Sequence, residues 1–273
     1  MARRIDRSVL LRSVIVWLAI AAGLAVQAQP INSEKADFVL DTVARGLDFP
    51  WGLAFLPDGR FLVTERSGTM RYVSAAGDLS APLSGLPEIA VKGQGGLMDV
   101  VLDPGFHSNQ QIFFSYAAAD DGGYGTNVAS ARLGHDALTE VKVIFRALPR
   151  RSGGRHFGSR LLFLADKSLL ITLGDRGHRP NGQNLGTHPG SIVRIRRDGS
   201  VPLDNPFLDL DGVRPEIYTF GNRNVQGIAL DTETGVVWAN EHGPQGGCEI
   251  NQVIAGSRTP SACSASPIRL PVP

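Results

Sequence analysis

The sequence is poor in cysteine, in net charge and in long apolar runs, and each shortage excludes a class of protein. Two cysteines in 273 residues cannot supply the dense disulfide framework of a small secreted domain. A formal net charge of +1 offers no basic surface for nucleic acid. An apolar run over residues 13–26 is shorter than the roughly 20 residues that a membrane-spanning helix needs. We therefore expect neither a nucleic-acid partner nor stable membrane insertion.

Several catalytic motifs are missing as well. The chain has no HExxH, no GxSxG, no paired CxxC, no Walker loop and no GxGxxG after an expected strand. Hydrolysis by a serine triad and redox chemistry with a nicotinamide cofactor therefore lack a sequence signature. No stretch keeps helical periodicity over about a dozen residues. Gly 32 and Pro 17 indicate many tight turns, which favours an all-β fold.

The first residues have the layout of an export signal. A basic start, "MARRIDRSVLLR", precedes the apolar run, and "VQA" places small or permissive residues before the next position. We predict a signal peptide over residues 1–28, cleaved after Ala28, and an N-terminal linker over residues 29–37. The protein is then expected to be periplasmic or secreted. A membrane anchor is the alternative, which the short apolar run disfavours.

One unit recurs four times: an apolar run, a polar turn with Gly, Asp or Pro, and a second apolar run closed by an acid or a tyrosine. Runs of this length, rich in Leu, Val, Ile and Phe, predict β-hairpins. The four copies cover residues 51–65, 95–116, 159–175 and 226–241. Further strands are expected at residues 69–74, 127–133, 142–148 and 191–197.

Hairpins that recur in this way, each followed by one or two more strands, are typical of the blades of a β-propeller. We predict a partial β-propeller over residues 38–255. A β-sandwich is the alternative, but it would not explain the same hairpin pattern four times. Propellers bind ligands at one mouth of the central channel, on loops next to the inner strands. Candidate site residues should therefore lie on those loops.

Four loops combine glycines with polar side chains next to an expected strand. They are "VKGQGGLMD" (91–99), "SGGRHFGSRLLF" (152–163), "TFGNRNVQGIAL" (219–230) and "NEHGPQGGCEIN" (240–251). Three of them precede the first strand of a repeat unit. In a propeller they would converge at the channel mouth.

The residue types in these loops suggest specific chemistry. His156 is a candidate general base, because the pKa of histidine lies near neutral pH, although a structural role is the other reading. Arg223, Asn224 and Gln226 offer a guanidinium fork and two amides, which suit a planar, multiply carboxylated or quinonoid ligand. The alternative is a turn held by side-chain-to-backbone hydrogen bonds. "HGPQGG" offers backbone carbonyls to a hard cation such as Ca²⁺, and Glu249 could add a carboxylate.

At these residues the sequence resembles the exported quinoprotein aldose dehydrogenases of the glucose/sorbosone dehydrogenase family. The matching stretches run in order over about residues 38–255: "PWGLAFLPDGRFLVTER", "GQGGLMDVVLDPGF", "HFGSRLLF", "LDNPF", "PEIYTFGNRNVQGIAL" and "EHGPQGG". The resemblance implies a six-bladed β-propeller, with about four blades in this chain. It also implies pyrroloquinoline quinone (PQQ) and Ca²⁺ as cofactors and oxidation of the anomeric carbon of aldose sugars to lactones.

The same resemblance implies roles for individual residues. His156 matches the base that removes the proton of the sugar C1 hydroxyl, and Gln94 matches a glutamine beside quinone and substrate. Three residues match the segment that contacts the cofactor: Arg223, Asn224 and Gln226. Three more match metal sites: the carbonyls of Gly243 and Pro244 for the cofactor's Ca²⁺, and Glu249 for a second Ca²⁺. The side chains of His242 and Cys248 are not expected to be ligands.

The chain departs from the family pattern in two places. Cys248 stands where the family has an acid. After about Ala255 the family continues with an aromatic segment and further blades, whereas this chain has a Ser- and Pro-rich tail over residues 256–273. We interpret this tail as non-native sequence of the kind that a frameshift or truncation produces. Fewer basic contacts would then impair quinone binding and activity. Whether Cys248 pairs with Cys263 stays open.

Two other functions fit the same sequence. One is a Ca²⁺-dependent propeller lactonase, a hydrolase, which would want several acidic or amide ligands at the channel mouth. The other is a propeller that binds without catalysing. For the dehydrogenase, the expected partners are an aldose substrate and an external electron acceptor, and a homodimer is the oligomer left open.

Overall fold

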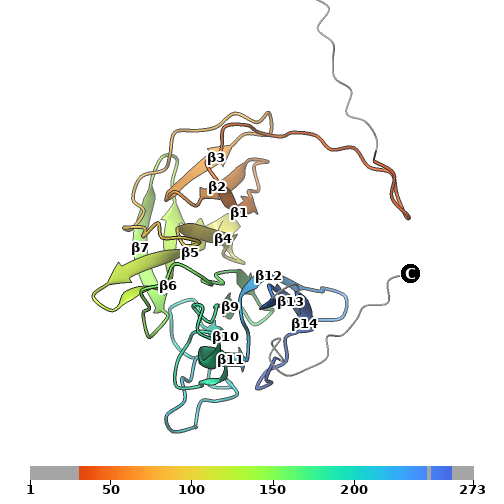
Figure 1. The fold of residues 1–273 in the computed structure, drawn as a ribbon. Coiled ribbons are helices and arrows are strands. Elements are labelled where there is room, and N and C mark those ends of the chain that lie inside the picture. Colours follow the sequence, from red (N-terminus) through yellow and green to blue (C-terminus); the bar gives the residue numbers. More distant parts are fainter. Residues whose placement is uncertain (1–30, 245–246, 260–273) are drawn as a thin grey trace, which may run out of the picture. The chain divides into compact units, whose positions relative to one another are not determined.

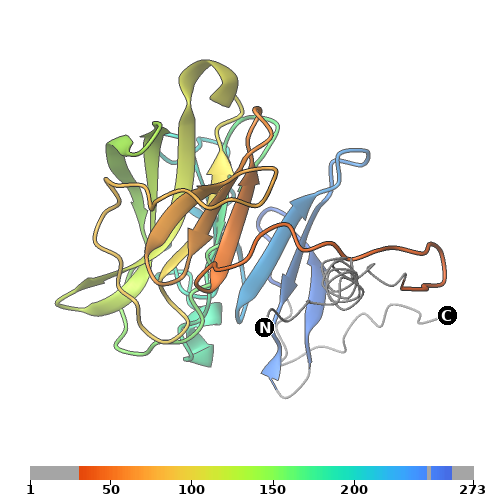
Figure 2. The ribbon, with the colours of Figure 1, turned by 90° about the horizontal axis from the view of Figure 1, so that it is seen from above.

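The computed structural model describes residues 31–244 and 247–259 (Figures 1 and 2). The expected signal peptide and residues 260–273 of the expected tail lie outside this range. The chain divides into two compact units at residue 43. In the first unit, Ile31 and Phe38 form an isolated antiparallel bridge through two backbone hydrogen bonds of 2.8 and 3.1 Å. No helix in the described part of the chain is long and apolar enough to cross a membrane.

The second unit consists of antiparallel β-sheets in chain order (Figure 1). Sheet 1 contains β1 (Pro50–Phe55), β2 (Phe61–Glu65) and β3 (Thr69–Val73). Sheet 2 contains β4 (Leu97–Leu102), β5 (Gln111–Asp120), β6 (Gly123–Leu133) and β7 (Leu138–Arg146). Sheet 3 contains β8 (Leu161–Phe163), β9 (Leu169–Thr172), β10 (Ser191–Ile195) and β11 (Ile217–Phe220). Sheet 4 contains β12 (Val225–Leu230), β13 (Val237–Glu241) and β14 (Glu249–Gln252).

Two short helical segments are α2 (Phe106–Asn109) and the 3-10 turn η1 (Arg179–Gln183). The all-β, antiparallel fold predicted from the sequence is confirmed. The four expected hairpins are the pairs β1–β2, β4–β5, β8–β9 and β12–β13. Two strands were not predicted, β11 and β14, and each has four residues.

Apolar side chains bury the faces between neighbouring sheets. Leu62 and Met70 of sheet 1 pack with Phe114 of sheet 2 in one cluster. A second cluster joins sheets 2 and 3, and a third joins Leu170 of sheet 3 to Val237 of sheet 4. Each sheet alternates side chains between its two faces, so an inner sheet can contribute to two clusters at once. Consecutive sheets therefore pack face to face.

The first strand of a sheet lies toward a common centre within this unit, and the later strands lie outside it. Figure 1 shows this for β1, β4 and β12, with β3 and β7 farther out. The chain enters each first strand from a loop on the same side. This topology brings loops that are far apart in the sequence to one place, where the candidate site lies.

Candidate functional site

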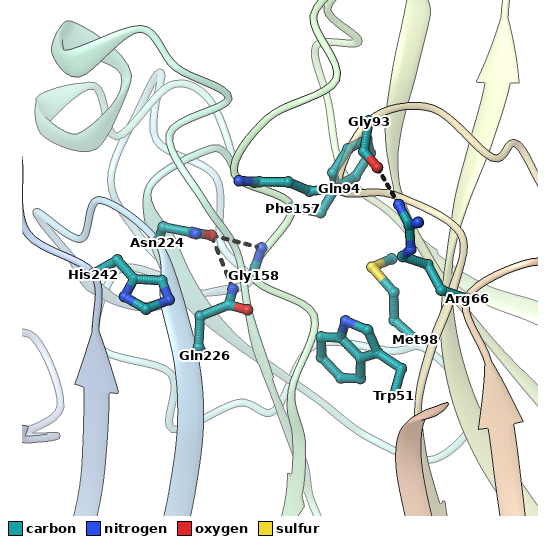
Figure 3. Close-up of a pocket in the computed structure, with 10 residues that line it drawn as sticks. All are labelled: Trp51, Arg66, Gly93, Gln94, Met98, Phe157, Gly158, Asn224, Gln226 and His242. Atoms are coloured by element: carbon teal, nitrogen blue, oxygen red, sulfur yellow. Dashed lines mark hydrogen bonds between the residues drawn. The ribbon is translucent and has the colours of Figure 1, made fainter. Parts of the chain in front are cut away.

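The starts of the first strands of all four sheets meet at a pocket with a volume of about 300 Å³ (Figure 3). Trp51 comes from β1, Met98 from β4, Gly158 from the segment before β8, and Gln226 from β12. The remaining lining residues are Arg66, Gly93, Gln94, Phe157, Asn224 and His242. Of the residues expected from the sequence to bind the cofactor, the pocket brings together Gln94, Asn224 and Gln226.

His156 lies next to the pocket, on the loop that also carries Phe157 and Gly158. It is 8% exposed, and its Nδ1 is 2.6 Å from Oδ1 of Asp175, which is 2% exposed. Asp175 follows β9 and holds the loop that leads to η1, because its Oδ1 also accepts the Gly177 N–H at 2.6 Å. A carboxylate at Nδ1 places the proton there and leaves the Nε2 lone pair available as a base.

The backbone of His156 is strained and tightly packed. Its φ of 54° lies in the left-handed region, which is uncommon for a residue other than glycine. Its N–H donates to Oε1 of Gln94 at 2.7 Å. A Cβ at Gly174 would lie 2.1 Å from the His156 carbonyl oxygen, so only glycine fits there. These contacts fix the position from which the imidazole projects.

Phe157 lines the pocket, and its ring lies against the guanidinium of Arg176. It is 2% exposed, and the Cζ atom of Arg176 lies 3.5 Å from the centre of its ring. Arg176 also donates to the carbonyls of Gly153 and Arg155 in the same loop. Burial lowers the pKa of Arg176 to about 10, which leaves it protonated at neutral pH. The loop before β8 is therefore fixed on two sides.

The loop between β11 and β12 supplies the opposite side of the pocket. Oδ1 of Asn224 accepts hydrogen bonds from the Gly158 N–H at 3.2 Å and from Nε2 of Gln226 at 3.1 Å (Figure 3). Arg223 does not line the pocket: its Nη1 donates to the His242 carbonyl at 2.6 Å. Its own carbonyl accepts the Asp175 N–H at 2.8 Å. The loop between β11 and β12 is therefore hydrogen-bonded to Asp175, the partner of His156, and to the segment after β13.

Glu241, the last residue of β13, binds the backbone of the loop between β11 and β12. Its Oε2 accepts the N–H groups of Arg223 and Asn224 at 2.5 and 3.0 Å. Burial, together with the nearby charge of Glu249, raises the pKa of Glu241 to about 7, although the two N–H donors oppose the shift. Oε1 of Glu241 is buried and has no hydrogen-bond partner among the described residues. Glu241 and Glu249 are directly opposite each other on β13 and β14.

The segment after β13 is only partly described, because residues 245 and 246 are outside the described range. Gly243 is tightly packed, since a Cβ there would lie 1.4 Å from the Gly247 carbonyl oxygen. The Pro244 carbonyl accepts the Gly247 N–H at 3.3 Å. Cys248 is exposed, and its Sγ lies 3.8 Å from Nδ1 of His242. Within the described residues, no group of three or more His, Cys, Asp or Glu side chains is placed to hold a metal.

Sequence reasoning missed several residues of this site, among them Phe157, Asp175, Trp51, Arg66 and Met98. Asp175 could have been found, because it is the acid that closes the third repeat copy. Trp51, Arg66 and Met98 gave no signal, since an aromatic, a cation and an apolar residue near a strand are common anywhere. Arg66 donates a hydrogen bond to the carbonyl of Gly93, the residue before Gln94. Its guanidinium is a cation on the side of the pocket opposite Asn224 and Gln226 (Figure 3).

The chain resembles known sugar dehydrogenases. Residues 47–258 match the family described as Glucose / Sorbosone dehydrogenase. The chain is 46% identical over 209 residues to aldose sugar dehydrogenase YliI of Escherichia coli, covering 75% of this chain and 56% of that protein. It is 27% identical over 289 residues to quinoprotein glucose dehydrogenase B of Acinetobacter calcoaceticus, covering 94% of this chain and 59% of that protein.

Among solved structures, the PQQ-bound form of an aldose sugar dehydrogenase from Streptomyces coelicolor superposes with a TM-score of 0.73 at 31% identity. The match covers 81% of this chain and 64% of that one. The chain thus spans less than two thirds of the length of these relatives.

Proposed function

The chain belongs to the glucose/sorbosone dehydrogenase family, and from this membership and its pocket we propose that it binds PQQ and oxidises the anomeric carbon of aldose sugars to lactones. The observation that carries the proposal is the His156–Asp175 pair beside the pocket. A buried carboxylate 2.6 Å from Nδ1 is the arrangement that prepares a histidine to act as a base. An external electron acceptor would then re-oxidise the cofactor.

The four sheets support the proposal that each is one blade of a β-propeller. They follow one another in chain order, pack face to face through three clusters of buried side chains, and turn their first strands toward one centre (Figure 1). The family's six-bladed ring would place the pocket at the mouth of the channel. The division into a partial propeller over residues 38–255 and a non-native tail from 256 belongs to the same proposal.

The residues present fit a planar, polycarboxylated quinone. The pocket has flat apolar walls in Trp51 and Phe157 and amides on its other side in Asn224 and Gln226. Arg66 lines it, so positive charge is available for carboxylates, and Arg223 donates to the carbonyl of His242, another lining residue. A volume of about 300 Å³ suits a compact ligand of this kind.

The residues of sheet 4 also fit a hard cation. Glu241 and Glu249 face each other across β13 and β14, where two like charges are unfavourable unless one is protonated or a cation lies beside them. The buried Oε1 of Glu241 lacks a partner in the described part of the chain, as an atom awaiting a ligand would. Carboxylate and backbone carbonyl oxygens are the donors that Ca²⁺ prefers. The carbonyls of Gly243 and Pro244 would hold the cofactor's Ca²⁺, and Glu249 would contribute to a second Ca²⁺ site.

In the proposed reaction, the residues of this chain orient the sugar and move one proton. His156 would accept the C1 hydroxyl proton at Nε2, and Asp175 would stabilise the resulting imidazolium through Nδ1–H. Gln94 fixes the histidine backbone and would lie beside the substrate. The bound PQQ supplies the two-electron oxidant. Export to the periplasm or beyond remains part of the proposal, and the described residues contain no membrane-spanning helix.

The proposal predicts that His156→Ala abolishes sugar oxidation without abolishing cofactor binding. The purified chain is incubated with PQQ and Ca²⁺, and glucose-dependent reduction of an artificial electron acceptor is followed. Removing a general base lowers the rate by on the order of 10²- to 10⁴-fold. His107→Ala is the matched control, because that histidine lies in α2, away from the pocket. Its rate should equal the rate of the unaltered protein.

The concentration of PQQ in this assay has to be chosen for weak binding. The chain is expected to bind the quinone weakly, so PQQ is titrated to saturation and binding is recorded separately by absorbance. A protein that hydrolyses lactones with Ca²⁺ alone would be a lactonase, and the dehydrogenase proposal would then be wrong. Binding of PQQ without any turnover at saturation would favour the non-catalytic reading.

A further inference from the structure

Arg160 connects all four sheets at the base of the pocket. It precedes β8, and its backbone N–H and carbonyl bond to Thr172 of β9 at 2.9 Å each. Its Nε donates to the Gln226 carbonyl of β12 at 2.8 Å. Its Nη1 donates to Oδ1 of Asp99 in β4 at 3.1 Å. Its Cζ lies 4.2 Å from the centre of the Trp51 ring in β1.

Asp99 anchors this arginine. It is 6% exposed, and its Oδ2 accepts the Leu161 N–H at 2.9 Å, so one carboxylate binds both the side chain of Arg160 and the backbone that follows it. Burial raises the pKa of Asp99, and the charge of Arg160 opposes that shift. A buried carboxylate of this kind requires its cation, because an unpaired charge inside a protein is strongly unfavourable.

Two of the groups that Arg160 contacts belong to residues on opposite sides of the pocket. In the view of Figure 3, Gly158 lies between Gln226 on one side and Trp51 on the other. The guanidinium is planar and has five N–H donors in a fixed geometry, so one group can lie over an indole while it donates to two oxygens. The width of the pocket between Trp51 and Gln226 therefore depends on Arg160.

We propose that Arg160 is a positioning residue for the cofactor pocket: its guanidinium holds the Trp51 ring and the Gln226 backbone at the separation that a flat ligand requires. The inference rests on the proposed function for the identity of that ligand. The position of Trp51 itself can be measured in the protein without any cofactor.

The first experiment reads Trp51 directly. Trp17→Phe and Trp238→Phe leave Trp51 as the single tryptophan, and acrylamide quenching of its fluorescence is measured without cofactor. Arg160→Met and Arg160→Lys are compared with the unaltered arginine in this background. Both should raise the quenching constant about twofold or more, because lysine carries the charge but cannot provide the planar fork. Arg160→Met combined with Asp99→Asn removes the unpaired carboxylate, in case Arg160→Met alone does not fold.

The second experiment measures the dissociation constant for PQQ by titration. Arg160→Lys should raise it about tenfold or more, because two walls of the pocket lose their common support. Arg197→Met is the matched control: Arg197 also joins two sheets, through Asp103 at 2.9 and 3.1 Å, but neither residue lines the pocket. It should lower the melting temperature and leave both Trp51 quenching and the PQQ dissociation constant within about twofold.

Unchanged Trp51 quenching in Arg160→Lys and in the double variant overturns the inference. So does an effect of Arg197→Met on quenching as large as that of Arg160→Met, since Arg160 would then act only through general stability. If the unaltered protein binds no PQQ, the proposed function fails, and the quenching result still decides the role of Arg160.

Discussion

At the scale of single residues, the acids that close three of the four repeat copies each bind a group just before the first strand of their sheet. In sheet 1, Oε1 of Glu65 accepts the Asp48 N–H at 2.7 Å, just before β1. In sheet 4, Glu241 accepts two N–H groups just before β12. In sheet 3, Asp175 holds instead the ring of His156, just before β8. A position that caps backbone in two sheets therefore orients the candidate base in a third.

Asp175→Asn tests this reading of the repeat. An amide can present its NH₂ to Nδ1, which moves the imidazole proton to Nε2 and removes the base. We expect the rate of sugar oxidation at saturating PQQ to fall by on the order of 10²- to 10⁴-fold, as a wrong tautomer costs in related arrangements. The melting temperature should fall as well, because Oδ1 of Asp175 contacts both Nδ1 and the Gly177 N–H, so an NH₂ turned toward Nδ1 takes the acceptor away from Gly177.

Asp103→Asn is the control for that experiment, because Asp103 is also a 2% exposed acid but pairs with Arg197 away from the pocket. Asp103→Asn should lower the melting temperature and leave the rate of sugar oxidation unchanged. Equal losses of rate in the two variants would show that Asp175 acts through folding and not through His156.

Polar pocket residues in glycine-rich loops could be predicted from the sequence, whereas the residues that form the walls of the pocket could not. Gln94, Asn224 and Gln226 were predicted and lie together, because their loops precede first strands. Trp51 and Arg66 were not predicted, since their roles arise only when sheet 1 lies beside the segments that precede β4 and β8. Arg223 was expected in the site, and its guanidinium is instead bound to the backbone of His242.

At the scale of elements, the hairpins were predictable and the short outer strands were not. Each hairpin has two apolar runs around a turn with Gly or Asp, and this pattern is local. β11 and β14 have four residues each, and β14 alternates half-buried with exposed side chains. A strand of this length forms because a neighbour supplies hydrogen bonds, as β13 does for β14. Its own sequence carries little of that information.

The β8–β9 turn gives a prediction for acid stability. Partial burial alone would raise the pKa of Asp166, but hydrogen bonds from Ser168 and Arg194 outweigh it and lower the pKa to about 2. A lowered pKa adds stability that is present above the ordinary value of 3.8 and is lost as pH falls through about 2. Asp166→Asn should therefore lower the melting temperature at pH 7 and match the unaltered protein near pH 2.

Melting temperatures of both proteins between pH 7 and pH 2 provide the test. Asp209→Asn is the comparison, because this acid has no side-chain hydrogen bond among those found in the described residues, and its substitution should change the melting temperature little. A difference between Asp166→Asn and the unaltered protein that stays constant across the whole range would rule out the ion pair with Arg194 as its cause.

At the scale of the whole molecule, the site depends on the coupling between sheets. The pocket takes residues from sheets 1 to 4, whereas the buried clusters join sheet 1 to 2, sheet 2 to 3 and sheet 3 to 4. A structure whose units contact mainly their neighbours can lose a terminal unit without losing the rest. Sheet 4 carries Asn224 and Gln226, so partial opening at that end would remove one side of the pocket.

Leu170→Ala tests this dependence, because Leu170 is fully buried in the cluster between sheets 3 and 4. The cavity should cost about 2–5 kcal/mol and act mainly on sheet 4. Amide hydrogen exchange should accelerate in β12 and β13 more than in β5 and β6, and PQQ binding should weaken. Leu62→Ala removes the same side chain from the cluster between sheets 1 and 2 and should leave β12 and β13 protected. Equal acceleration in all strands would show that the four sheets unfold as one cooperative unit, in which case the pocket opens only when the whole chain does.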